Sequence, residues 1–147
     1  MEKFLVKHLE DWTTVARSIT PHLRSGTILT LSGPLGAGKT TFVQALAKEL
    51  GSQSAPKSPT FSLLRTYGLK TGSDVRRLVH VDAYRIEKPK DVLPLNLDEE
   101  LTEPGTILAI EWPENLQAWL DRQTTKKIAL TINLEENDTR EVLLNAP

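Results

Sequence analysis

The chain has 147 residues, of which 39% are hydrophobic and 25% charged, and its formal net charge is −1. This length and composition predict one globular domain over residues 1–147, and the absence of cysteine excludes disulfides and thiolate metal sites. The sequence has no apolar run of about 18 residues and no signal-peptide apolar core near its start, so we expect a cytoplasmic protein without a membrane span. The near-neutral charge argues against tight binding of nucleic acid by this chain alone.

The first part of the chain predicts a strand, a helix and a second strand. Residues 4–6 are apolar and extended in pattern. A helix is expected to begin near Asp11 and to end or kink at Pro21, because its apolar residues recur at helical spacing. These residues are Trp12, Val15, Ala16 and Ile19. Residues 27–32 form a β-branched and apolar run that is typical of a buried strand.

The segment that follows this strand matches the phosphate-binding motif G-x-x-x-x-G-K-[ST]. Residues 33–40 read Gly-Pro-Leu-Gly-Ala-Gly-Lys-Thr, and a helical apolar pattern runs from Phe42 to Leu50 before Gly51. Backbone N–H groups of a tight glycine loop, together with the start of a helix, bind polyphosphate. Lys39 is expected to contact the β- and γ-phosphates, and the Thr40 hydroxyl to bind Mg²⁺.

The remaining pattern predicts an α/β fold. Strands are expected at residues 61–67, 77–82, 106–110, 128–134 and 141–144, short helices at 97–101 and 113–120, and irregular segments at 53–59, 68–74 and 88–94. The order indicates a P-loop NTPase-like domain: a mixed, mostly parallel sheet with helices on both faces and a C-terminal antiparallel hairpin. Ligands of such sheets bind beyond the carboxyl ends of the strands.

Polar residues gather at the end of one predicted strand. Residues two apart in an extended chain share a face, so His80, Asp82 and Tyr84 are expected to project together. Val79 and Val81 would then face the core. Asp82 could hold Mg²⁺ directly or through water, or it could cap a turn.

A second acid also ends an apolar strand. Glu111 follows residues 107–110, which is the general form of the second nucleotide-binding motif of P-loop proteins. Such an acid binds Mg²⁺ or its water shell, or orients a water for attack on the γ-phosphate. The neighbouring Trp112 could stack on a ligand or partner, or simply pack.

Two further residues have an open interpretation. Thr60 lies in a proline-marked loop after the P-loop helix, where nucleotide switches can carry a threonine that senses the metal or γ-phosphate. It could equally be an ordinary loop hydroxyl. Arg85 could clamp phosphate or form a surface salt bridge.

Four short segments form a combination that is more specific than the phosphate-binding motif alone. They are Gly-Pro-Leu-Gly-Ala-Gly-Lys-Thr-Thr at 33–41, Ser-Pro-Thr-Phe at 58–61, His-Val-Asp-Ala-Tyr-Arg at 80–85 and Ile-Glu-Trp-Pro at 110–113. In this order and spacing they resemble the bacterial TsaE (YjeE) ATPases. The resemblance covers nearly the whole chain, and the proline at position 34 replaces a residue that is often acidic in relatives.

The resemblance implies an ATPase required for making threonylcarbamoyladenosine in tRNA, which works with the partner proteins TsaD and TsaB. Thr40 and Glu111 would hold Mg²⁺, Asp82 would support the metal or the attacking water, and Thr60 would be the switch residue. ATP or ADP would be bound by Thr13 and Arg140 and, at the phosphates, by Gly36, Ala37, Gly38, Lys39, Thr40 and Thr41. The tRNA would be reached through the partners.

The residues leave two other functions open. In a small-molecule kinase, Asp82 would act as base toward an acceptor hydroxyl, although the chain has no separate arginine-rich lid segment. In a nucleotide-gated binding module, ATP occupancy alone would switch partner affinity. The absence of an Asn-Lys-x-Asp guanine-reading motif favours ATP over GTP.

Overall fold

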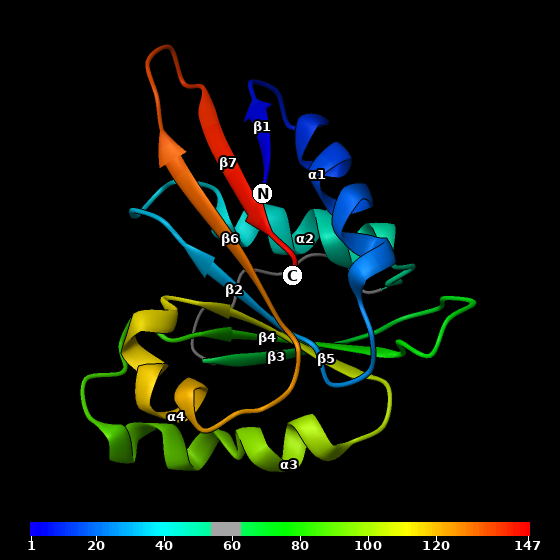
Figure 1. Ribbon diagram of the computed structural model, residues 1–147, viewed down its shortest axis with the longest axis vertical. Coiled ribbons are helices and arrows are strands. Elements are labelled where there is room, and N and C mark those ends of the chain that lie inside the picture. Colours follow the sequence, from blue (N-terminus) through cyan, green and yellow to red (C-terminus); the bar gives the residue numbers. More distant parts are fainter. Residues whose placement is uncertain (54–62) are drawn as a thin grey trace.

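A seven-stranded sheet forms the centre of the computed structural model, which describes residues 1–53 and 63–147 (Figure 1). Its strand order is β1-β7-β6-β2-β5-β4-β3. The strands are β1 (Glu2–Val6), β2 (Ile28–Ser32), β3 (Leu64–Gly68), β4 (Arg77–Asp82), β5 (Thr106–Glu111), β6 (Lys127–Leu134) and β7 (Arg140–Asn145). Strands β2, β4, β5 and β6 run parallel, whereas β3 and β7 are antiparallel to their neighbours. The predicted mixed, mostly parallel sheet and its C-terminal hairpin are confirmed.

Helices cover both faces of the sheet, as expected (Figure 1). Helices α1 (Asp11–Ile19) and α2 (Lys39–Glu49) pack together on one face, with a 3₁₀ turn at Thr20–His22. Helices α3 (Leu97–Thr102) and α4 (Gln117–Asp121) lie on the other, with 3₁₀ helices at Pro89–Leu95 and Pro113–Leu116. No helix within residues 1–53 or 63–147 is both long and apolar enough to cross a membrane.

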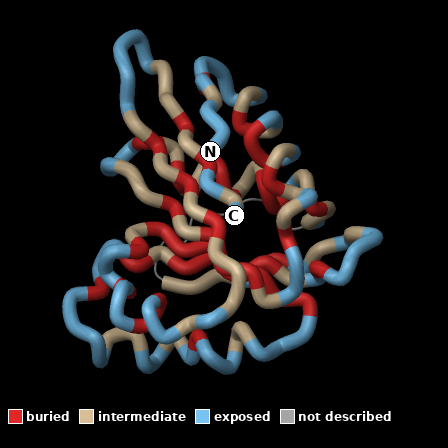
Figure 2. The backbone as a smooth tube through the Cα atoms, viewed as in Figure 1, coloured by how far each residue is buried: buried red, intermediate tan, exposed pale blue. Residues whose placement is uncertain are grey.

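The sheet separates two apolar clusters, which appear as the buried centre of Figure 2. Val15 of α1 and Phe42 of α2 are fully buried against one face, and Leu97 and Trp119 pack on the other. Burying each such side chain contributes about 1.5–3 kcal/mol. These clusters fix the central strands, whose carboxyl ends carry the candidate site.

Strand β4 differs from its prediction because both of its faces are covered. It lies between β3 and β5 in the sheet. Side chains alternate between its two faces, so Val79 and Val81 join one apolar cluster and Leu78 joins the other. His80 shares the face of Leu78 and is 2% exposed, and Tyr84 lies beyond the strand end and is 52% exposed. Alternation along β4 keeps His80 and Asp82 on one face and turns Val79 and Val81 to the core, as predicted, but that face is buried at His80 because central parallel strands are covered on both sides, and Tyr84 lies outside the strand.

The segment predicted as irregular at 88–94 forms the 3₁₀ helix Pro89–Leu95. A proline at its first position suits the fixed proline φ, and the Asp91 carboxylate accepts hydrogen bonds from the backbone N–H groups of Glu87 and Lys88. These two bonds lower the pKa of Asp91 below its ordinary value. Sequence periodicity misses such a helix because it is short and has no long apolar stripe.

Candidate functional site

A cavity of about 440 Å³ lies where the central parallel strands end. Asp82 and Glu111 are opposite each other in the β4–β5 register, so both strand-end acids reach it. The rest of the lining comes from the loop before α2, the β1–α1 connection and the C-terminal hairpin. These residues are 6–9 and 35–41 together with Trp12, Tyr84, Trp112 and Arg140.

Two glycines shape the loop between β2 and α2. Gly36 and Gly38 have φ of +80° and +107°, in the left-handed region that side chains rarely adopt. A Cβ on Gly38 would lie 2.6 Å from Cζ2 of Trp12, whose ring meets Phe42 edge-on with 6.0 Å between centroids. The first turn of α2 follows at once, and its N–H groups have no acceptor within the helix. The loop and helix thus have the backbone geometry that suits an anion.

Lys39 lies at the first position of α2 and is 5% exposed. Its Nζ donates hydrogen bonds to the carbonyl oxygens of Gly33 and, at 3.2 Å, of Pro34, and it lies 3.7 Å from the centroid of the Trp112 ring. Burial lowers the pKa of Lys39 below its ordinary value, while the charge of Glu111 and two further acids opposes this shift. The ammonium group is therefore held next to the loop although it loses part of its hydration there, which disfavours its charged form.

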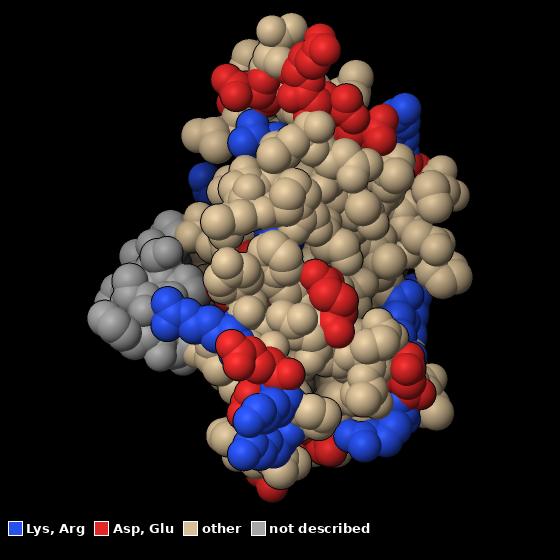
Figure 3. All heavy atoms as spheres, turned by 90° about the vertical axis from the view of Figure 1, so that its left-hand side faces the viewer, with Lys and Arg blue, Asp and Glu red and all other residues tan. Residues whose placement is uncertain are grey.

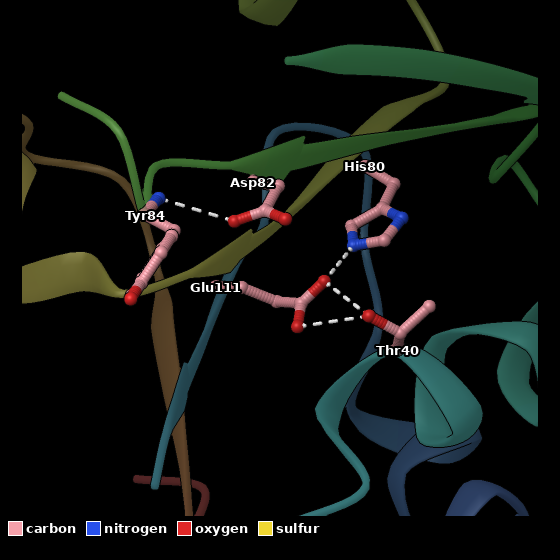
Figure 4. Close-up of polar contacts among 5 residues, drawn as sticks. All are labelled: Thr40, His80, Asp82, Tyr84 and Glu111. Atoms are coloured by element: carbon pink, nitrogen blue, oxygen red, sulfur yellow. Dashed lines mark hydrogen bonds and ion pairs between the residues drawn. The ribbon is translucent and has the colours of Figure 1, made fainter. Parts of the chain in front are cut away.

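The Glu111 carboxylate contacts two polar side chains at the cavity, those of Thr40 and His80 (Figure 4). The Thr40 hydroxyl lies 3.0 Å from Oε1 and 2.9 Å from Oε2 of Glu111. Nε2 of His80 lies 2.5 Å from Oε2. The structure thus brings Thr40 and Glu111 together, as predicted, and adds His80, which sequence reasoning did not assign to the site.

Asp82 caps a turn, as one of its two interpretations predicted, and it also lines the cavity, so a role toward a metal ion stays a prediction. Its Oδ1 accepts a hydrogen bond of 3.1 Å from the backbone N–H of Tyr84 (Figure 4). The Tyr84 ring turns away from the two acids and meets the Trp112 ring, with 5.0 Å between centroids. Trp112 has φ of 60° and ψ of 54°, a left-handed conformation that costs a non-glycine residue about 1–3 kcal/mol.

Arg140 ties the C-terminal hairpin to the phosphate-binding loop. Its Nε and Nη2 donate to the carbonyl oxygens of Ala37 and Gly36, at 3.2 and 3.3 Å. Thr13 follows Trp12 in α1 and is not among the residues that line the cavity. Arg85 is exposed and does not line it either. Thr60 lies outside the described residues.

The cavity thus collects most of the residues predicted for the site, and their roles stay predictions. Those on its lining are Gly36, Ala37, Gly38, Lys39, Thr40, Thr41, Asp82, Glu111 and Arg140. Sequence reasoning did not assign Trp12, which the helical stripe marks only as core. Its contact with Gly38 joins segments that no local pattern connects.

Gly38→Ala is expected to weaken ADP binding by at least about tenfold, because the new Cβ is strained at positive φ and meets the Trp12 ring. Gly36→Ala has the same backbone strain but open space within 4 Å of the Cβ, so its effect should be smaller. Titration calorimetry with ADP measures both. Equal losses of ADP affinity in the two variants would show that the clash with the Trp12 ring adds nothing to the backbone strain.

Comparison with known proteins identifies a matching family over almost the whole chain. The family model described as "Threonylcarbamoyl adenosine biosynthesis protein TsaE" matches residues 6–142. The tRNA threonylcarbamoyladenosine biosynthesis protein TsaE of Bacillus subtilis is 32% identical over 137 residues, which cover 93% of this chain and 80% of the relative. The protein of that name from Aquifex aeolicus is 34% identical over 144 residues, which cover 97% of this chain and 94% of the relative.

A solved structure has the same architecture. The crystal structure of Bacillus subtilis YdiB matches with a TM-score of 0.73 and 26% sequence identity, covering 99% of this chain and 84% of that chain. Sequence and structure comparisons therefore agree over nearly all of the sheet and the cavity.

Proposed function

Since the chain belongs to the TsaE family of threonylcarbamoyl adenosine biosynthesis proteins, we propose that it is a magnesium-dependent ATPase that supports threonylcarbamoyladenosine formation in tRNA. The observation that carries the proposal is the contact of Thr40 with Glu111 at the mouth of a phosphate-binding loop. It joins the two oxygen-bearing residues that a nucleotide-bound metal ion requires in P-loop enzymes.

The ligand atoms in the cavity suit magnesium bound together with nucleotide phosphates better than a metal ion bound by protein ligands alone. Thr40, Asp82 and Glu111 offer hydroxyl and carboxylate oxygens at one cavity, and such oxygens are the ligands Mg²⁺ prefers. Among residues 1–53 and 63–147, no group of three or more His, Cys, Asp or Glu side chains could hold an ion alone. This agrees with Mg²⁺ bound by one or two protein groups together with substrate phosphates.

The chain's own residues would act mainly by positioning. The N–H groups at the start of α2 and the Lys39 ammonium would hold the β- and γ-phosphates, and Thr40 and Glu111 would hold the ion. When bound, magnesium would neutralise part of the negative charge on the phosphate oxygens. Asp82 or Glu111 would orient the attacking water, and the γ-phosphoryl group would pass to that water with ADP as leaving group.

We expect slow turnover in isolation. Arg140 is the one arginine on the cavity lining within the described chain, and its guanidinium bonds loop carbonyls rather than pointing freely into the cavity. An arginine that stabilises the transferred phosphoryl group can raise the rate by several orders of magnitude. Partner proteins of the TsaD and TsaB kind would therefore raise the rate.

Surface charge supports an indirect route to tRNA. Figure 3 shows that acidic side chains gather at the end where the β6–β7 hairpin lies, and that basic and acidic side chains mix at the other end. The hairpin turn carries Glu135, Glu136 and Asp138. Tight autonomous binding of RNA requires a continuous basic surface, which this face lacks. We propose a cytoplasmic complex in which partner proteins contact the tRNA, and the mixed charge of this face agrees with that proposal.

The test is to follow the γ-phosphate of labelled ATP. The purified chain with Mg²⁺ should release inorganic phosphate slowly, EDTA should stop the release, and TsaB and TsaD should accelerate it. GTP in place of ATP is the matched control and should be a poorer substrate. Label that appears on a small molecule would instead indicate a kinase. Binding without any phosphate release, with or without partners, would indicate a nucleotide-gated module.

A further inference from the structure

We propose that His80 is a positioning residue that fixes the Glu111 carboxylate and leaves one defined oxygen, Oε1, to the nucleotide-bound metal ion. The inference rests on the proposed function, because it takes Glu111 as a group that holds magnesium. His80 does not itself line the cavity. It acts through Glu111.

The contact between the two side chains is short and shielded from water. Nε2 of His80 lies 2.5 Å from Oε2 of Glu111, and the side chains are 1% and 4% exposed. An ionised carboxylate only accepts hydrogen bonds, so Nε2 donates. A hydrogen bond to a charged group is strong, and low local polarity strengthens it further.

His80 makes the carboxylate asymmetric, which Thr40 cannot do. The Thr40 hydroxyl lies at 3.0 and 2.9 Å from the two oxygens of Glu111, so its single hydrogen does not select one of them. His80 contacts Oε2 alone. The His80 contact alone therefore distinguishes the two oxygens, and Oε1 is the one that His80 does not contact (Figure 4).

The two contacts also come from different parts of the fold. Thr40 belongs to the first turn of α2, directly after the loop that would take up phosphate. His80 belongs to β4, which is hydrogen-bonded on both sides, and it pairs with Ala109, two residues before Glu111 on β5. His80 thus holds Glu111 from the central sheet, whereas Thr40 contacts it from the element that follows the loop.

This arrangement has a measurable consequence for metal binding. Residues that orient metal ligands typically change metal affinity by about 10- to 100-fold when they are removed. Loss of the His80 contact should therefore weaken the contribution of magnesium to nucleotide binding. Binding of the nucleotide without metal depends on the loop and Lys39 and should change little.

The experiment measures the affinity for ADP by titration calorimetry, once in EDTA and once in excess MgCl₂. The ratio of the two dissociation constants is the magnesium effect. The variants are His80→Leu, which removes the donor, and His80→Gln, whose amide can donate from a similar position. Leu78→Val is the packing control, because Leu78 is buried on the same face of β4.

His80→Leu should reduce the magnesium effect by about 10- to 100-fold with an unchanged affinity in EDTA. His80→Gln should restore a large part of the effect, and Leu78→Val should lower only the unfolding temperature. Adding His80→Leu to Glu111→Gln should cause no further loss. A wild-type magnesium effect in His80→Leu, or equal losses in His80→Leu and His80→Gln, would overturn the positioning role. No magnesium effect in the wild type would overturn the proposed function itself.

Discussion

Lys39→Met is expected to lower the rate of ATP hydrolysis by about 100- to 1,000-fold while the chain stays folded. Removing one preorganised donor to developing charge costs about 2.7–4 kcal/mol of transition-state stabilisation. Methionine keeps the length of the side chain and its packing beside the Trp112 ring, but it has no charge to offer the phosphates. Phosphate release under saturating ATP and Mg²⁺ measures the change.

The stability of the Lys39→Met variant should be equal to or higher than that of the wild type, although its activity falls. Burial lowers the pKa of Lys39, so the charged ammonium group is less favourable in the folded chain than in the unfolded chain. Replacing it removes this desolvation cost, and water can take its place at both carbonyl groups, since Pro34 is exposed and Gly33 is half-buried. The unfolding temperature should therefore stay level or rise.

Lys48→Met is the matched control, because Lys48 is exposed in the last turn of the same helix. It should leave hydrolysis at the wild-type rate. Hydrolysis by Lys39→Met at the wild-type rate would show that the phosphate-binding loop does not perform this chemistry.

Local patterns were sufficient to predict the glycine loop before α2 and the position of the two acids. The loop motif is contiguous, and Asp82 and Glu111 each end a run of apolar residues that reads as a buried strand. Parallel strands bring their carboxyl ends to one edge of a sheet, so the acids were expected to meet. The β4–β5 register places them opposite each other.

The partners of these residues depend on tertiary contacts that no periodicity reports. The pattern around His80 predicted a polar face shared with Asp82, but it did not predict that this face is buried at His80 or that the ring contacts Glu111. The spacing of two residues between His80 and Asp82 was the available sequence signal that His80 lies near the site, and it did not indicate which residue His80 would contact. Trp12 likewise reads as core, although its ring also lies against Gly38 across the fold.

Arg140 illustrates a third case, in which the resemblance identified a residue that spacing could not. It begins β7, far along the sequence from the loop whose carbonyls it bonds. The pairing of β7 with both β6 and β1 brings it to the cavity. Motifs and periodicity thus locate residues within one segment, whereas contacts between distant segments were found only where the family resemblance pointed to them, as at Arg140.

Glu111→Gln is expected to reduce ATP hydrolysis by at least about 100-fold, since a carboxylate that orients the attacking water and takes up its proton contributes a factor of about 100 to 10,000. Glutamine has the same shape, and its amide oxygen can still accept from Thr40, so the fold and ADP binding in EDTA should persist. Glu114→Gln is the control, because this nearby acid contributes charge near Lys39 without lining the cavity.

The same variant distinguishes hydrolysis from simple occupancy as the function of the site. A reconstituted assay of tRNA threonylcarbamoyladenosine formation with TsaB and TsaD should fail to sustain turnover with Glu111→Gln, because ATP would bind without being consumed. Glu114→Gln should support the assay fully. If Glu111→Gln bound ATP, released no phosphate and still sustained modification at the wild-type rate, occupancy alone would operate the complex.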